Sequence, residues 1–227
     1  MGGKYYAPLA YVEKYYREDA EDDVRFPKEA KFWRSFLKQV QGKSVLSVGC
    51  GPQFYDDCQF FKSVPKEYVG MDVNRAVFDF LRSSTHTRLI NGKKYAARHG
   101  IRTKLICGDI TRYCMRFMER FDTILAVGVL GNFGEEKLGQ LVEYLHEYLK
   151  KGGLLINVEW TDCHLPTREF HKKLQYRFYA DRVPSMETIA KILKEKGFSI
   201  ERQAVFDVEN PKAYGWGKIY GYVARKR

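Results

Sequence analysis

The chain has 227 residues and a formal net charge of +11, from 39 lysines and arginines against 28 aspartates and glutamates. This length suits a single α/β domain, which buries roughly 70% of its unfolded surface without disulfide or metal staples. The five cysteines form no CxxC pair, so the sequence indicates neither a disulfide framework nor a zinc site, and we expect no bound metal. The basic residues are scattered along the chain, which disfavours nucleic acid as a partner despite the charge.

No stretch of the sequence approaches the ~20 apolar residues that a membrane span requires, and the first residues lack the basic patch and apolar core of a signal peptide. We therefore expect a cytoplasmic protein without membrane contact, either a monomer or a weak dimer. One domain should cover residues 1–227, with an N-terminal arm at 1–41, a core at 42–160 and a last part at 161–227.

Short apolar runs, each followed by a stretch that can form a helix, begin after residue 42. They predict strands at 44–48, 68–71, 104–107, 123–127 and 154–158. Such alternation is typical of a parallel sheet with covering helices. A helix at 135–150 should end at Gly152 and Gly153, and a second helix, opened by Ser185, should end at Gly197.

The end of the chain alternates between apolar and polar residues at 198–208 and 219–223, which predicts two strands paired as a hairpin. The expected fold is therefore a Rossmann-like, mostly parallel sheet of seven strands with an antiparallel last strand and helices on both faces. The aromatic N-terminal arm and the segment 160–184 stand outside this core. Both should lie near the carboxyl ends of the strands, where open α/β sheets bind ligands.

A glycine turn follows the first predicted strand, with the sequence Gly49-Cys50-Gly51-Pro52. The glycines permit a tight turn and a close approach of the backbone to a ligand, and the turn amides can receive a carboxylate. A dinucleotide-binding loop usually carries a third glycine at the sixth position, where this chain has Phe54. The turn therefore disfavours a nicotinamide or flavin cofactor.

Two acids follow the next two predicted strands. Asp72 stands 23 positions after Gly49, close to the ~20 expected of an acid that accepts hydrogen bonds from ribose hydroxyls. Asp109 follows the third strand, where it can accept from an adenine amino group while Ile110 packs on the base. Taken alone, each acid could instead cap a helix. The glycine turn and both acids together favour binding of a nucleoside.

With these features the chain resembles the class I S-adenosylmethionine-dependent methyltransferases over nearly its whole length. Residues 121–127 look like the fourth motif of that class, which implies that Val127 and Gly128 line the sulfonium end of the cofactor. A narrower resemblance is to the nicotinamide, phenylethanolamine and indolethylamine N-methyltransferase family. It is carried by residues 8–16, 49–55, 108–111 and 223–226.

The resemblance implies S-adenosylmethionine as the cofactor and a role for each matching residue. Tyr11 and Tyr16 would contact it from an N-terminal helical lid and Tyr55 would contact its amino-acid part, although an amphipathic helix packing its rings on the sheet explains the arm equally well. The cofactor-binding set is then Tyr11, Tyr16, Gly49, Cys50, Gly51, Pro52, Tyr55, Asp72, Val73, Asp109, Ile110, Val127 and Gly128.

The methyl acceptor is expected to be a small molecule with a nitrogen nucleophile, attacked in line, so that positioning supplies much of the acceleration. A hydroxyl or an ammonium would need a base, for which Glu159, His164 or His171 is available. Glu159 and His164 are the catalytic candidates, and the substrate-binding candidates are Asn132, Phe133, Glu159 and Trp160. An RNA or protein methyltransferase that uses the basic surface, and a binding protein without catalysis, stay open as alternatives.

Overall fold

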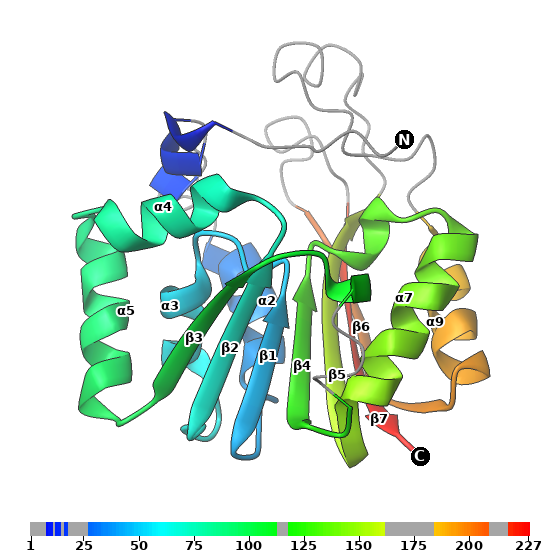
Figure 1. Ribbon diagram of the computed structural model, residues 1–227. Helices are drawn as coiled ribbons and strands as arrows, with labels where there is room; N and C mark the ends of the chain where they lie inside the picture. Colours follow the sequence, from blue (N-terminus) through cyan, green and yellow to red (C-terminus); the bar gives the residue numbers. More distant parts are fainter. Residues whose placement is uncertain are drawn as a thin grey trace.

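The computed structural model describes residues 8–10, 12–14, 16–17, 27–112, 118–161, 184–208 and 218–227. These form one sheet of seven strands in the order β3-β2-β1-β4-β5-β7-β6 (Figure 1). The strands are β1 (Ser44–Val48), β2 (Glu67–Asp72), β3 (Arg102–Cys107), β4 (Phe121–Val127), β5 (Leu149–Thr161), β6 (Phe198–Asp207) and β7 (Lys218–Lys226). The first five strands are parallel, and β7 is antiparallel to both β5 and β6, which confirms the predicted fold class.

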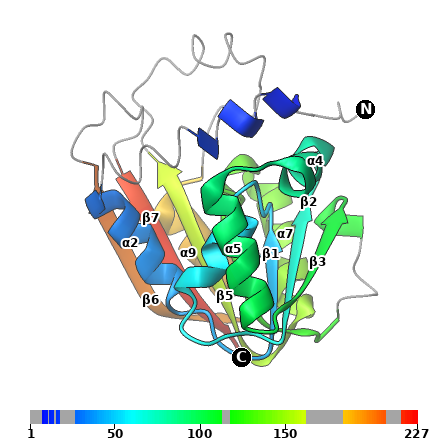
Figure 2. The ribbon, with the colours of Figure 1, turned by 90° about the vertical axis from the view of Figure 1, so that its left-hand side faces the viewer.

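Helices cover both faces of the sheet (Figures 1 and 2). One layer holds α2 (Pro27–Leu37), α3 (Phe54–Asp57), α4 (Arg75–Ser83) and α5 (Thr87–Arg98), and the other holds α7 (Glu135–Tyr148) and α9 (Met186–Glu195). Short 3-10 turns lie at η1 (Cys58–Phe60), η2 (Ile110–Arg112) and η3 (Leu130–Asn132).

Alternation along the central strands divides the core between the two layers. In β1, Val45 packs with the α2–α5 layer and its neighbour Leu46 packs with α7 and α9. In β4, Leu125 packs with the α2–α5 layer and Ile124 packs with α7 and α9. Successive side chains of a strand point to opposite faces of the sheet. The apolar runs of the sequence are therefore strands buried on both faces.

The helix before β5 ends earlier than the sequence predicts. α7 stops at Tyr148, and β5 already begins at Leu149, which pairs with Phe121 across a register shift in β4. Gly152, with φ of +74°, and Gly153 lie inside the strand and do not end the helix. The prediction was wrong here because the strand pairing that recruits 149–151 is a long-range contact that helical periodicity does not encode.

Phe54 opens α3 at the position where a dinucleotide-binding protein would have its third glycine. Its ring stacks on Tyr68 at a centroid distance of 4.1 Å. A Cβ added to Gly70 in β2 would lie 2.6 Å from Phe54 Cδ2, so the ring fills the space above the bare glycine. The aromatic side chain thus packs α3 onto the sheet, which sets the direction of the chain after the glycine turn.

The described residues of the N-terminal arm are helical from residue 9 to residue 17 and lie beside α4 (Figure 2). Val12 and Tyr16 are buried, and the Tyr16 ring packs edge-on against His86 and tilted against Phe80. Within the part of the chain that the structure describes, no helix has the length and apolar character needed to cross a membrane.

Candidate functional site

The glycine turn after β1 has the backbone that the sequence predicts. Gly49 has φ of +58° and Gly51 has φ of +53°, both in the left-handed region that residues with a side chain rarely adopt. The Cys50 amide donates to Met71 O at 3.0 Å, and the Gly51 amide donates to Asp72 Oδ2 at 3.1 Å. The turn is therefore fixed to the end of β2 by two hydrogen bonds.

Asp72 lies half-buried at the carboxyl end of β2. Its Oδ1 accepts from the Asn74 amide at 2.8 Å, and Oδ2 accepts from Gly51. Burial raises the pKa of Asp72, and the backbone N–H groups of Asn74, Gly51 and Val73 oppose that rise. α4 is capped by Asn74, whose side chain accepts from the Ala76 amide, so the helix-capping alternative does not apply to Asp72.

Asp109 follows β3 and begins a short 3-10 turn. Its Oδ1 accepts from the Thr111 amide at 3.0 Å and from Thr111 Oγ1 at 2.8 Å, so this acid does cap the turn η2. Ile110 is 6% exposed and belongs to the core, and its carbonyl accepts from the Tyr148 hydroxyl. The sequence placed both residues correctly at the carboxyl end of β3, with Ile110 more deeply buried than a residue that lies open to a ligand.

The switch point of the sheet lies between β1 and β4, and the space at the carboxyl ends of these two strands is the candidate ligand crevice. The connections from β1 and β4 lead in opposite directions from there, and ligands of open α/β sheets bind at such a point. Gly128, with φ of +65°, turns the chain after β4, and its amide donates to Val158 O. Gly49, Asp72, Val127 and Gly128 all lie at this carboxyl edge, and Val73 is half exposed beside them.

Two further residues predicted to bind the cofactor, Cys50 and Pro52, are buried in the glycine turn. Cys50 is buried, and burial raises the pKa of its thiol well above the ordinary value, so the sulfur is protonated and unreactive. Pro52 is also buried, and Gln53 separates it from the start of α3 at Phe54.

Glu159 is 3% exposed, on the strand next to β4. A single oxygen, Oε1, accepts from the Val129 amide at 2.9 Å, the Leu130 amide at 2.6 Å and Asn157 Nδ2 at 2.8 Å. Burial raises the pKa of Glu159 to about 7 against these hydrogen bonds. The carboxyl group that the sequence singled out is therefore tied to the backbone of the turn after β4.

The structure does not bring every predicted residue to the crevice. The Tyr55 hydroxyl lies 3.4 Å from Thr103 Oγ1, near the start of β3, which is the opposite end of the sheet from the glycine turn. The Tyr16 hydroxyl donates to Asp56 Oδ2 at 2.6 Å, beneath the arm. Phe133 is half-buried and packs against the core on the α7 side.

The remaining predicted residues are described only in part. Asn132 ends η3 and Trp160 lies in β5, and for both only the backbone is described. Tyr11, His164 and His171 lie outside the described residues.

Three residues of the site were missed from the sequence. Asn74 caps α4, Val129 covers Gly49, and Asn157 joins Glu159 to the carbonyl of Ala126. Asn74 is of a residue type that favours the start of a helix, and Asn157 is a polar residue inside the apolar run of β5. Buried polar side chains are hydrogen-bonded, so the position of Asn157 alone predicts a buried partner.

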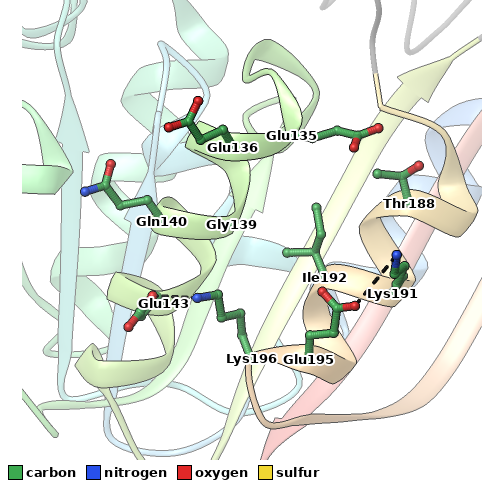
Figure 3. Close-up of a pocket in the computed structure, with 10 residues that line it drawn as sticks. All are labelled: Glu135, Glu136, Gly139, Gln140, Glu143, Thr188, Lys191, Ile192, Glu195 and Lys196. Atoms are coloured by element: carbon green, nitrogen blue, oxygen red, sulfur yellow. Dashed lines mark hydrogen bonds and ion pairs between the residues drawn. The ribbon is translucent and has the colours of Figure 1, made fainter.

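A separate groove of about 770 Å³ lies between α7 and α9, on the other face of the sheet from the α2–α5 layer (Figure 3). Its walls carry two ion pairs, Lys196 with Glu143 at 2.6 Å and Lys191 with Glu195 at 3.8 Å. None of the predicted site residues that the structure describes lines this groove. Among the described residues, no group of three histidines, cysteines or acids could hold a metal ion.

The sheet order defines a Rossmann-like α/β fold, with the left-handed glycine turn and Asp72 together at the carboxyl ends of β1 and β2. Residues 16–203 match the family model described as a methyltransferase domain, and the chain belongs to that family. No curated protein matches the chain significantly.

Solved structures share the fold at low identity. A S-adenosylmethionine-dependent methyltransferase from Clostridium acetobutylicum is 15% identical, with a TM-score of 0.58 over 93% of this chain and 98% of that one. The N-methyltransferase NodS from Bradyrhizobium japonicum, solved with S-adenosyl-L-homocysteine, is 14% identical, with a TM-score of 0.55 over 88% of each chain. A methyltransferase from Methanosarcina mazei is 16% identical, with a TM-score of 0.53 over 82% of this chain and 94% of that one.

Proposed function

We propose that the chain is a S-adenosylmethionine-dependent methyltransferase that methylates a small molecule, at a nitrogen nucleophile. The observation that carries this proposal is Asp72, a half-buried carboxylate at the end of β2 that is hydrogen-bonded to the glycine turn and is not used to cap a helix. A carboxylate in this place is suited to accept hydrogen bonds from two adjacent ribose hydroxyls.

S-adenosylmethionine, when bound, supplies an activated methyl group. The chain's own contribution is to bind and to orient. The turn 49–52 offers backbone N–H groups, Asp72 offers an acceptor, and Asp109 and Ile110 mark the edge of the crevice beyond β2. Since methyl transfer is an in-line displacement, fixing donor and acceptor in the right geometry supplies much of the rate.

The more specific part of the proposal is that the methyl acceptor is a small molecule with a nitrogen nucleophile. It rests on the sequence motifs that resemble amine-methylating enzymes, and the general methyltransferase family model does not support that narrower resemblance. A methyl-transfer screen with amines, phenols and RNA separates the acceptor classes. Binding of the cofactor with no transfer to any of them would instead favour a binding protein without catalysis.

Asp72→Asn tests the cofactor site. We expect the affinity for S-adenosylhomocysteine to fall by about 1–3 kcal/mol, roughly 5- to 150-fold, because an amide replaces the charged acceptor. Isothermal titration calorimetry measures the change, with Asp207→Asn at the exposed end of β6 as the matched control. Binding of equal strength in a folded Asp72→Asn variant would contradict the ribose role, and wild-type protein that shows neither heat nor a thermal shift would contradict the proposed function.

A further inference from the structure

Glu159 links two neighbouring strands, β4 and β5, at the carboxyl edge of the sheet. It lies in β5, and its Oε1 accepts hydrogen bonds from the backbone amides of Val129 and Leu130, which follow β4. Asn157, two residues earlier in β5, donates both to Glu159 Oε1 and to Ala126 O in β4. The turn after β4 is therefore held to β5 through one carboxylate oxygen, in addition to the strand ladder.

The same turn lies directly on the cofactor loop. A Cβ added to Gly49 would be 2.6 Å from Val129 Cγ2, so the Val129 side chain covers the bare glycine. The amide of Val129 is one of those that Glu159 holds. A shift of this backbone would therefore move the Val129 side chain toward or away from the loop that we propose to bind the cofactor.

The environment of Glu159 makes its charge sensitive to pH. Among the described residues, the groups that shift its pKa are all uncharged: the Asn157 side chain and the backbone N–H groups of Val129, Leu130 and Gly131. Tyr220, its partner on β7, is also buried, and its hydroxyl is 3.4 Å from Pro184 O. With no cation among these groups, desolvation raises the pKa from 4.5 to about 7.

We propose that Glu159 is a positioning residue for the cofactor site: its ionised carboxylate fixes the turn after β4 against Gly49, and the affinity for the cofactor follows its ionisation. The inference rests on the proposed function. Hydrogen bonds to a charged acceptor are roughly twice as strong as neutral ones, so protonation loosens the Val129 and Leu130 amides without a change in the covalent structure. In this role Oε1 acts on the protein backbone, because its three donors are the Val129 and Leu130 amides and Asn157 Nδ2.

Ionisation of Glu159, which we propose strengthens cofactor binding, lowers the stability of the folded protein. Its pKa in the folded protein lies above the ordinary value, so the folded chain holds the proton more tightly than the unfolded chain between about pH 4.5 and about pH 7. The free energy of unfolding therefore falls as the pH rises through that window. A variant without the charge should lose this pH dependence and melt at a higher temperature than the wild type above about pH 7.5.

Glu159→Gln tests the proposal, with Glu201→Gln on the exposed face of β6 as the matched control. Calorimetry with S-adenosylhomocysteine between about pH 6 and about pH 8.5 should give a wild-type affinity that rises about 10-fold with pH. The Glu159→Gln variant should bind weakly at every pH, and Glu201→Gln should follow the wild type. A Glu159→Gln variant that keeps the wild-type profile would overturn the proposal.

A second measurement needs neither ligand nor variant. The amide resonances of Val129 and Leu130 in the wild-type protein should titrate with a midpoint at about pH 7. Resonances that do not move would overturn the positioning role even if the variant fails to fold. If these amides titrate and S-adenosylhomocysteine does not bind at any pH, the proposed function fails, and with it the link from Glu159 to the cofactor.

Discussion

Gly49→Ala is expected to reduce the affinity for S-adenosylhomocysteine at least about 100-fold. The added Cβ strains the backbone and also clashes with Val129. Gly49 has φ of +58°, and this left-handed conformation costs a residue with a Cβ about 1–2 kcal/mol of conformational energy. The new Cβ would also lie 2.6 Å from Val129 Cγ2, a distance that real contacts do not reach. Valine is stiff at χ1, so the loop and not the side chain must move.

Gly100→Ala separates these two causes. Gly100 has φ of +67°, so it carries the same backbone strain, and nothing lies within 4 Å of the Cβ that alanine would add. We expect this control to lose about 1 kcal/mol of stability in urea denaturation and to bind the ligand as the wild type does. Equal affinities for the two alanine variants would show that the clash does not matter. Adding Val129→Ala to Gly49→Ala should recover part of the binding.

Much of the fold could be predicted because it depends on local patterns. Apolar runs such as 44–48 and 123–127 are strands buried on both faces, and the short segments that follow them are helices. The start of β5 at Leu149 could not be predicted, because it depends on pairing with Phe121. The sequence around Leu149 and Phe121 does not indicate that they pair. Gly152 and Gly153 are misleading, because glycines at this place suggest the end of a helix.

In the candidate site, too, local patterns could be predicted and contacts that depend on packing could not. The sequence placed Gly49, Asp72 and Asp109 at the carboxyl ends of their strands, because strand ends can be read from apolar runs. It could not give the direction of the Tyr55 hydroxyl, which depends on how α3 packs on the sheet. Nor could it show that the partners of Glu159 are backbone amides of a turn about 30 residues earlier, since a backbone N–H has no residue identity.

A buried charge cluster holds the N-terminal arm on the domain. Asp56 is 1% exposed, and its Oδ2 receives the Tyr16 hydroxyl at 2.6 Å and Arg88 Nε at 2.8 Å. The guanidinium carbon of Arg88 also lies 5.8 Å from the centre of the Tyr16 ring. The arm, α3 and α5 therefore meet at one carboxylate, which was not recognisable from the sequence because its three members are far apart in the chain.

Arg88→Met should lower the free energy of unfolding by about 2–4 kcal/mol, because it removes the cation and leaves the buried Asp56 carboxylate with less compensation. The value lies below that of a fully buried pair because Arg88 is 20% exposed. Urea denaturation followed by circular dichroism measures it, with the exposed Arg82→Met on α4 as the matched control. Adding Asp56→Asn should cost less than the sum of the single changes, since the negative charge that Arg88 accompanies is then gone. A loss no greater than that of Arg82→Met would show that the cluster does not hold the arm through charge.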